Sequence, residues 1–383
     1  MFLAGQTVSL IGTWMQGLAQ NWLVYRLTHS TLLMGTVGFC QYLPILVLGP
    51  FAGIAADRHQ RRKLVILTQA AFLLQASSLA ALTLGDAITL PLLLMLAVVW
   101  GVINAFDIPA RQSMYIQLVG REDLPNAIAL NSMAFNAARV LGPSMAGLAV
   151  AAFGEGVCFA INAASYLVVL ASLLVMRVSE SQVSPAGAPF ALLRDGLAYA
   201  WRHRHVRTLL AVCALANLSM APTSVLGPVF ADAIFHRGSP GLGLLVGSLG
   251  LGALAGTGVL ARASNPAALP RVVLHGAFLN CLALVVFALS PWFGLTLAAM
   301  GLCGFSIFRM LSAINTLIQT SIDDAYRGRV MSLYSITVVG MTPIGNLAAG
   351  AAAEYAGPRV AVFAGALLAL GAATLWGRRE TSS

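Results

Sequence analysis

Residues 157–176 read VCFAINAASYLVVLASLLVM, a run of twenty residues without a charged side chain. A helix rises 1.5 Å per residue, so this run extends about 30 Å, which is the thickness of the hydrocarbon core of a bilayer. The strands of outer-membrane barrels instead alternate apolar and polar residues over about ten residues. The run therefore predicts a transmembrane α-helix.

The composition of the whole chain resembles that of this run. Of the 383 residues, 58% are hydrophobic and only 9% are charged, against about 25% charged residues in soluble domains. A soluble domain would need more polar surface, and a disordered chain would be less hydrophobic. We therefore predict an all-α membrane protein that crosses the bilayer many times. The net charge of +9 comes from arginine with the single lysine Lys63, and we assign it to loops rather than to nucleic-acid binding.

Charge clusters and Gly/Pro turns divide the chain into twelve apolar segments. The segments cover residues 3–25, 32–56, 64–84, 90–109, 125–152, 157–177, 208–230, 241–262, 271–290, 292–318, 328–353 and 357–377. The eighth segment carries seven glycines between Gly241 and Gly258, but small residues allow close helix packing in a bilayer, so a helix is still expected. No basic segment precedes the first run, which is too long for a signal peptide and is predicted to be a spanning helix.

The longest polar segment divides these spans six and six. We expect an N-terminal half over residues 1–177, a cytoplasmic linker over 178–207 and a C-terminal half over 208–383. Apolar residues recur at helical spacing in the second part of the linker, which predicts an amphipathic helix on the cytoplasmic face. These residues are Phe190, Leu193, Leu197 and Trp201.

Basic residues are unevenly shared between the two sides of the predicted bundle. Most of the 22 lie in loops on the side of the two termini, whereas Arg26, Arg237 and Arg359 lie on the other side. Cytoplasmic loops carry the excess of Lys and Arg. We therefore expect a multi-pass protein of the cell inner membrane with both termini in the cytoplasm.

The two halves share residues at an offset of 200 positions. The matched residues are Gly101 with Gly301, Asp123 with Asp323, Ser132 with Ser332 and Pro143 with Pro343. They favour a duplicated six-helix unit, which is an architecture of transporters.

A polar motif between the second and third segments reads Gly53-Ile-Ala-Ala-Asp57-Arg58-His-Gln-Arg61-Arg62. Gly53 allows close helix contact, and an ionised Asp57 can face a helix N-terminus or an arginine near the start of the eleventh span. The arginines could pair with Asp323 and Asp324. Such a contact would hold one face of a transporter shut in one state; the alternative is an ordinary basic loop.

Two motifs resemble signatures of the major facilitator superfamily. The loop motif is similar to G-x-x-x-D-R-x-G-R-R, with Gln60 in place of the second glycine. In the fifth segment, Gly142-Pro143-Ser-Met-Ala-Gly147 resembles the G-P-x-x-G-G element of the drug antiporters of that superfamily, with Ala146 in place of a glycine. Proline kinks a helix and the glycines let a neighbour pack into the bend, so generic kinked packing is the alternative.

A wider set of short stretches narrows the resemblance to one branch of the superfamily. The stretches are Gly12-Thr-Trp-Met-Gln16, Trp22-Leu-Val-Tyr25, Pro109-Ala-Arg-Gln112, Asn126-Ala-Ile-Ala-Leu-Asn131 and Arg327-Gly-Arg-Val-Met-Ser-Leu-Tyr334. They look like the transmembrane secretion effector group, which includes the enterobactin exporter and macrolide-efflux proteins. The resemblance implies twelve helices in two halves, alternating access and export of a small molecule.

Arg139 and Arg309 lie within predicted spans. A midplane arginine costs roughly 2.5–3.5 kcal/mol on insertion scales, so it usually faces a wet cavity or a partner. Arg139 could bind an anionic or polar-acceptor substrate, could change partner between states, or could form a fixed structural pair. For Arg309, nearer the interface, snorkelling is the favoured reading.

Other polar residues of the spans are candidates for the substrate pathway. Asp107, Asn104, Gln16 and Gln20 are possible partners of Arg139. Helices 1, 4, 7 and 10 line the cavity in the superfamily, which favours Gln16, Asn104 and Asn217, and Asn136 is a further candidate. Helix–helix hydrogen bonding is the alternative for each amide. Asp107 is the only acid expected within a span, and its helix is expected to lack arginine. It is therefore the first candidate for the proton-binding residue if transport is coupled to protons.

The sequence also argues against other classes. With one lysine, Lys63, the chain has no phosphate-binding loop, and it lacks H-E-x-x-H and G-x-S-x-G motifs. We expect no enzyme activity, no metal or other cofactor, and no nucleotide or nucleic-acid partner. We predict a secondary transporter, expected to be a monomer, that exports a drug-like compound or siderophore, with proton antiport as the expected source of energy. The alternatives are an importer on the same fold, a non-transporting membrane sensor and a membrane-embedded enzyme.

Overall fold

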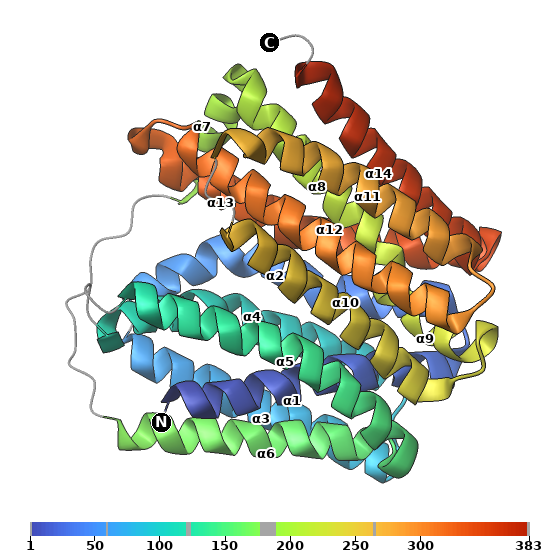
Figure 1. Cartoon of the computed structure of the whole chain (residues 1–383). Helices are drawn as coiled ribbons and strands as arrows, with labels where there is room; N and C mark the ends of the chain where they lie inside the picture. The colour runs from blue at the N-terminus through green and yellow to red at the C-terminus, as the bar shows by residue number, and fades with distance from the viewer. Residues whose placement is uncertain (1, 59, 120–123, 177–188, 263–265, 381–383) are drawn as a thin grey trace. The chain divides into compact units, whose positions relative to one another are not determined.

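The computed structural model describes residues 2–58, 60–119, 124–176, 189–262 and 266–380, and the regular structure of these residues is helical (Figure 1). The first six helices are α1 (Phe2–Thr28), α2 (Thr31–Arg58), α3 (Arg61–Leu84), α4 (Leu90–Val119), α5 (Leu124–Phe153) and α6 (Glu155–Val175). The short α7 (Pro189–Arg202) follows. The remaining long helices are α8 (Arg204–Val225), α10 (Gly238–Arg262), α11 (Leu269–Leu289), α12 (Phe293–Thr320), α13 (Asp324–Ala356) and α14 (Pro358–Glu380).

The end of α8 is followed by two short elements. These are α9 (Gly227–Val229) and a π-helical turn (Phe230–Ile234). A 3-10 turn, Pro266–Ala268, precedes α11.

Each of the twelve predicted segments is matched by a long helix, and α7 confirms the helix predicted in the linker. Within the described residues, ten helices are long and apolar enough to cross a membrane. The prediction for the fourth segment was wrong at one end, because α4 continues to Val119 rather than ending at residue 109. Pro109 lies inside α4, as proline does in many membrane helices. Asp107 and Arg111, one turn apart, neutralise each other there.

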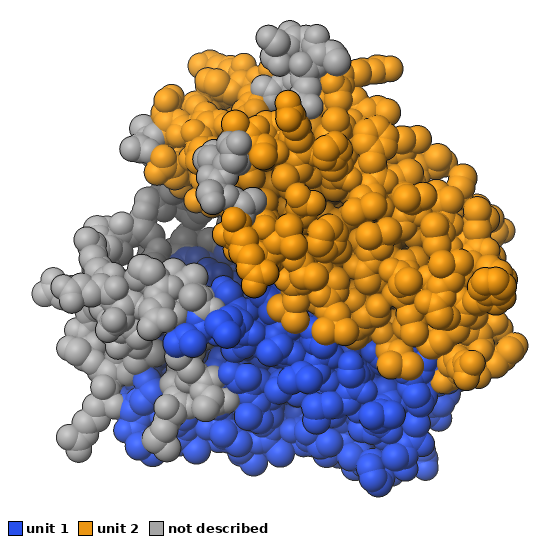
Figure 2. Space-filling view, viewed as in Figure 1, with its two compact units in different colours: residues 1–29, 40–189, 238–243 blue, residues 30–39, 190–237, 244–383 orange. Residues whose placement is uncertain are grey.

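The helices form two compact units (Figure 2). Unit 1 consists of residues 1–29, 40–189 and 238–243, and unit 2 of residues 30–39, 190–237 and 244–383. Each unit therefore contains most of one predicted half together with the first turns of a helix from the other half. Those first turns belong to α2 in unit 2 and to α10 in unit 1.

The same helix pairs pack in both units. In unit 1, α1 packs on α5 and α6, and α3 packs on α4 and α6. In unit 2, α8 packs on α13 and α14, and α11 packs on α12 and α14. Small residues bring these helices close. A Cβ added at Gly12 of α1 would lie 2.6 Å from Oδ1 of Asn162 on α6, and one added at Gly276 of α11 would lie 2.8 Å from Cβ of Met310 on α12.

Candidate functional site

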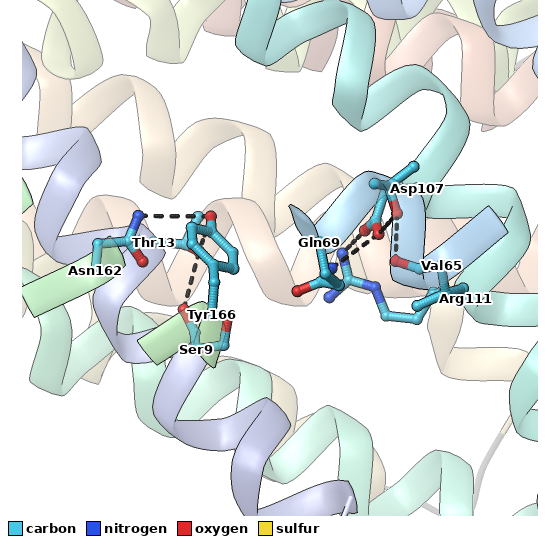
Figure 3. Close-up of polar contacts among 9 residues, drawn as sticks. Ser9, Thr13, Val65, Gln69, Asp107, Arg111, Asn162 and Tyr166 are labelled. Carbon is cyan, nitrogen blue, oxygen red and sulfur yellow. Dashed lines mark hydrogen bonds and ion pairs between the residues drawn. The ribbon is translucent and has the colours of Figure 1, made fainter. Parts of the chain in front are cut away.

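A buried carboxylate ties α3 to α4 (Figure 3). Asp107 of α4 is fully buried, and its carboxylate is paired with the guanidinium of Arg111 one turn further along the same helix. From α3, Thr68 Oγ1 and Gln69 Nε2 donate hydrogen bonds to Asp107 Oδ1 at 2.8 and 2.9 Å. A charge inside a membrane protein is tolerated when it is paired and hydrogen-bonded in this way.

Arg111 corrects the sequence analysis in one respect. It was placed in a loop, and α4 was expected to contain no arginine, whereas Arg111 is helical and lies within the apolar part of α4. Asp107 is therefore one member of an ion pair rather than an isolated acid. The signal in the sequence was the i, i+4 spacing of an acid and a base.

Gln16 does not face an open pathway but lies in a buried network of three helices. Its Nε2 donates to Oε1 of Gln75 on α3 at 3.1 Å, and its Oε1 accepts from Nδ2 of Asn162 on α6 at 2.7 Å. Gln75 Nε2 continues the network to the carbonyl of Leu96 on α4 at 3.3 Å. Gln16 is 2% exposed. The helix–helix reading of Gln16 is therefore the one that this structure supports.

The network extends along α1 and α6 (Figure 3). The hydroxyls of Thr13 and Tyr166 lie 3.2 Å apart, Asn162 Nδ2 lies 3.5 Å from the same Tyr166 oxygen, and Thr13 Oγ1 donates to the carbonyl of Ser9. The Tyr166 ring stacks on Phe72 of α3 with 5.3 Å between centroids. These contacts fix the rotation of α1, α3 and α6 about their axes.

The counterpart helices of unit 2 are joined at one similar point. Asn280 Nδ2 of α11 donates to Ser219 Oγ of α8 at 3.0 Å, and both residues are fully buried. A buried polar contact thus joins the first and third long helices in each unit.

Replacing Asn162 by alanine is expected to lower thermal stability, because it removes the bond to Gln16 and leaves a buried amide oxygen without its donor. Interhelical hydrogen bonds in membrane proteins contribute about 0.6 kcal/mol on average and up to about 1.7 kcal/mol. The apparent Tm of the protein in detergent measures the change. The matched control is Asn217→Ala, since Asn217 is half-buried and donates to the carbonyl of Cys213 in its own helix. Equal Tm values for the two variants would contradict the prediction.

The other pathway candidates lie in mixed surroundings. Arg139 of α5 is 4% exposed, and its Nη2 donates to Asn136 Oδ1 at 3.0 Å, so the structure brings these two candidates together. Asn217 is half-buried and donates to the carbonyl of Cys213 in its own helix at 2.9 Å. The guanidinium of Arg309 lies 5.7 Å from the centre of the Phe305 ring. Of the two remaining candidates, Asn104 is half-buried and Gln20 is buried.

The loop motif binds backbone carbonyls of the same unit. Arg62 donates from Nε and Nη2 to the carbonyl of Leu173 at 3.1 and 2.8 Å, which caps the end of α6. Arg61 Nη1 donates to the carbonyl of Ser113 on α4 at 3.3 Å. Among the described residues, nothing lies within 4 Å of a Cβ built at Gly53, so the close helix contact predicted there is not found.

Part of the predicted lock lies outside the described residues, whereas Asp323 is described and exposed. The part outside consists of the side chains of Asp57, Arg58 and Asp324. The start of α13, the expected partner of Asp57, contacts α7: Tyr199 stacks on Tyr326 with 4.5 Å between ring centroids. Other contacts there include an ion pair of 3.6 Å between Arg329 and Asp195.

The Gly-Pro element of α5 makes the close contacts predicted for it. A Cβ added at Gly142 would lie 2.6 Å from Cβ of Trp14 on α1. A Cβ added at Gly147 would lie 2.9 Å from Cα of Gly243 on α10, within unit 1. Pro143 lies between them inside the helix.

The sequence matches the family described as transmembrane secretion effector over residues 1–380. It is 24% identical to the Staphyloferrin A transporter of Staphylococcus aureus over 93% of this chain and 89% of that protein. It is 28% identical to the multidrug efflux pump Tap of Mycolicibacterium fortuitum, over 88% of this chain and 84% of that one. For the enterobactin exporter EntS of Shigella boydii the identity is 26%, over 90% and 82%.

The fold is similar to solved transporter structures. A bacterial homologue of the human lysosomal transporter Spinster, in an inward-facing and occupied conformation, gives a TM-score of 0.80 at 13% identity and covers 100% of this chain and 96% of that chain. A bacterial homologue of the iron transporter ferroportin gives 0.74 at 17% identity, with coverage of 98% and 97%.

Together the helical membrane fold and these relatives define a multi-pass transporter of the major facilitator superfamily rather than an enzyme. Within that superfamily, the chain belongs to the family of transmembrane secretion effectors.

Proposed function

We propose that this protein is a secondary active exporter of a small molecule. The observation that carries the proposal is the match to the secretion-effector family over residues 1–380, together with relatives named for siderophore export and multidrug efflux. The equivalent helix packing in the two units supports twelve spanning helices in two six-helix halves, residues 1–177 and 208–383, joined by the linker 178–207.

The proposed mechanism is alternating access in the inner membrane, with both termini in the cytoplasm. The basic loops on the side of the termini support this orientation. The motif from Gly53 to Arg62 would stabilise one state at the cytoplasmic face. Arg61 and Arg62 tie α3 to α4 and α6, so these helices would move together as one body when the motif changes partner. A monomer contains all of these parts.

Proton antiport is the proposed source of energy. Each elementary charge that moves across 100 mV supplies about 2.3 kcal/mol. Asp107 is the proposed proton acceptor, and its pairing with Arg111 sets a condition on the mechanism. The carboxylate accepts a proton when the guanidinium moves away, so proton uptake and a shift of the end of α4 would be coupled.

The proposed substrates have anionic or hydrogen-bond-accepting groups. Arg139 supports this class, because it is a buried cation in a membrane helix and lies beside the half-buried amide of Asn136. Two relatives are named for staphyloferrin A and enterobactin, and a third for multidrug efflux, so both siderophores and drug-like compounds belong in the first test panel.

The test is energised efflux from a pump-deficient bacterium. Cells would be loaded with dyes and drugs, and loss rates compared with and without a protonophore and for Asp57→Asn. We expect protonophore-sensitive efflux that falls at least about tenfold in the variant. Efflux that ignores the protonophore would contradict proton coupling. Expression that raises cellular accumulation, without any change in secreted metabolites, would favour the alternative of an importer on the same fold.

A further inference from the structure

The first turns of α2 cross the last turns of α13 within unit 2. Thr31 Oγ1 donates to the carbonyl of Gly350 at 3.0 Å. One turn further along α2, a Cβ added at Gly35 would lie 3.0 Å from Cα of Gly350 and would also collide with the carbonyl of Asn346. A hydroxyl and a glycine, four residues apart, thus hold the two backbones together.

The first turns of α10 cross α5 within unit 1 in the same manner. Ser239 Oγ donates to the carbonyl of Gly147 at 3.1 Å. A Cβ added at Gly243 would lie 3.1 Å from Cα of Gly147 and 2.9 Å from the carbonyl oxygen of Pro143. Thr31 and Gly35 therefore correspond to Ser239 and Gly243.

The two crossings differ in how the start of the entering helix is bound. Glu354, one turn after Gly350, binds the start of α2 with a single carboxylate oxygen. Its Oε2 accepts from Ser30 Oγ at 3.1 Å, from Thr31 Oγ1 at 3.0 Å and from the backbone N–H of Leu32 at 3.1 Å. A carboxylate there satisfies an orphan N–H and faces the positive end of the helix dipole.

The α5–α10 crossing has no acid at the corresponding position, and it also lacks two of the donors that Glu354 binds. Ala151, one turn after Gly147, occupies the position of Glu354. Pro240 occupies the position of Leu32 and has no N–H to donate, and Gly238 stands where Ser30 supplies a hydroxyl. The carboxylate is therefore a feature of the α2–α13 crossing alone.

Both crossings join a helix of one proposed half to a helix of the other. In the proposed orientation, α2 and α10 begin at the outer face and α5 and α13 end there. An opening of the outer face has to separate both pairs. The small-residue contacts resist separation by packing, whereas the contact of Glu354 adds a charge that must find other donors when α2 leaves.

We propose that Glu354 is a latch that holds the outer end of α2 on α13 and makes this crossing the second of the two to release. The proposal rests on the proposed orientation and on the two-half transport cycle. Removal of the charge shifts the population toward the outward-open state.

The experiment measures distances between spin labels in the full chain reconstituted in nanodiscs. Cys40 and Cys281 are first replaced by alanine, because these two native thiols are not fully buried. An outer pair carries labels at residues 86 and 292, and an inner pair carries labels at residues 63 and 271. All four native residues are exposed.

Glu354→Gln is the principal variant, since it keeps the shape of the side chain and removes the charge. We expect the outward-open fraction, read as the long-distance population of the outer pair, to rise by about threefold or more. Glu354→Ala is expected to raise it further, and the inner pair shortens in parallel.

The matched control is Glu155→Gln. Glu155 begins α6 and forms an ion pair of 2.8 Å with Arg26 at the end of α1, so it is an acid at the same face that joins two helices of one half. Its loss is expected to leave the outer distance unchanged.

Two results would overturn the latch. In the first, both Glu354 variants give the same outer-pair distance distribution as the parent protein. Two populations in the parent distribution confirm that the labelled protein does change state. The other is an equal shift in Glu155→Gln. The distance distributions of the parent protein test whether it alternates between two states, and the efflux assay tests whether it is an exporter. A failure of either proposal can therefore be distinguished from a failure of the latch.

Discussion

Replacing Asp107 by alanine is expected to lower the unfolding free energy by several kcal/mol. The substitution removes the carboxylate from Arg111 and two hydrogen bonds from α3. Breaking a buried ion pair by deleting one partner costs about 3–5 kcal/mol, and the lower end applies here because the Arg111 side chain keeps 19% of its exposure. The apparent Tm in detergent should fall by roughly 5 °C.

The double variant Asp107→Asn with Arg111→Gln is the decisive comparison. It removes both charges and keeps the shapes, so it should recover much of the stability that Asp107→Ala loses. Efflux should remain impaired in the double variant if Asp107 carries the proton. A double variant as unstable as the single one would contradict this expectation and show that the ion pair itself, rather than the oxygen acceptor that asparagine keeps for Thr68 and Gln69, holds this site together.

The extent of α4 shows why charges are poor markers of helix ends in a membrane protein. The span was predicted to end at residue 109, with Arg111 in the loop beyond it, but Asp107 and Arg111 each remove the cost of burying the other. The residues beyond them, such as Met114, are fully buried again. An acid and a base one turn apart, followed by buried apolar residues, predict a helix that continues.

Gln16 shows a second limit of the sequence. Its position in the first helix was predictable, but the side to which it points was not. A helix in a bilayer is apolar on every face, so its hydrophobic pattern does not fix its rotation about its own axis. Only the contacts with Gln75 and Asn162 place Gln16 inside the bundle.

The register of the internal repeat is a third case. The identical residues of the two halves align Pro143 with Pro343. The helix crossings instead match Gly147 with Gly350. Gly142 and Gly345 also correspond, because each packs on the first long helix of its unit. Pro143 is therefore level with Asn346. The glycines at the helix contacts, rather than the prolines, are therefore equivalent in the two halves. Close approach of two backbones restricts the residue at a position more strictly than a helix kink does.

Arg139 provides the test of substrate class. It is buried at 4% exposure in a helix whose next turn carries the Gly-Pro element, and its Nη2 donates a hydrogen bond to Asn136 on the same helix. A guanidinium in a membrane helix attracts anions, and a charge-assisted hydrogen bond from it to an anionic substrate contributes about 1.5–3 kcal/mol.

Replacing Arg139 by glutamine is therefore expected to reduce the efflux of carboxylate- or catecholate-bearing substrates by at least about tenfold, since 1.4 kcal/mol corresponds to a factor of ten. Efflux of uncharged lipophilic dyes should fall by less than about threefold, and the apparent Tm should not fall. The measurement is the initial rate of loss from loaded cells at equal expression. Arg139→Lys is the companion variant, because it keeps the charge and removes the fork of donors; it should retain part of the anion efflux. An equal loss for anionic and uncharged substrates, accompanied by a lower Tm, would show that Arg139 holds the bundle together rather than selecting its cargo.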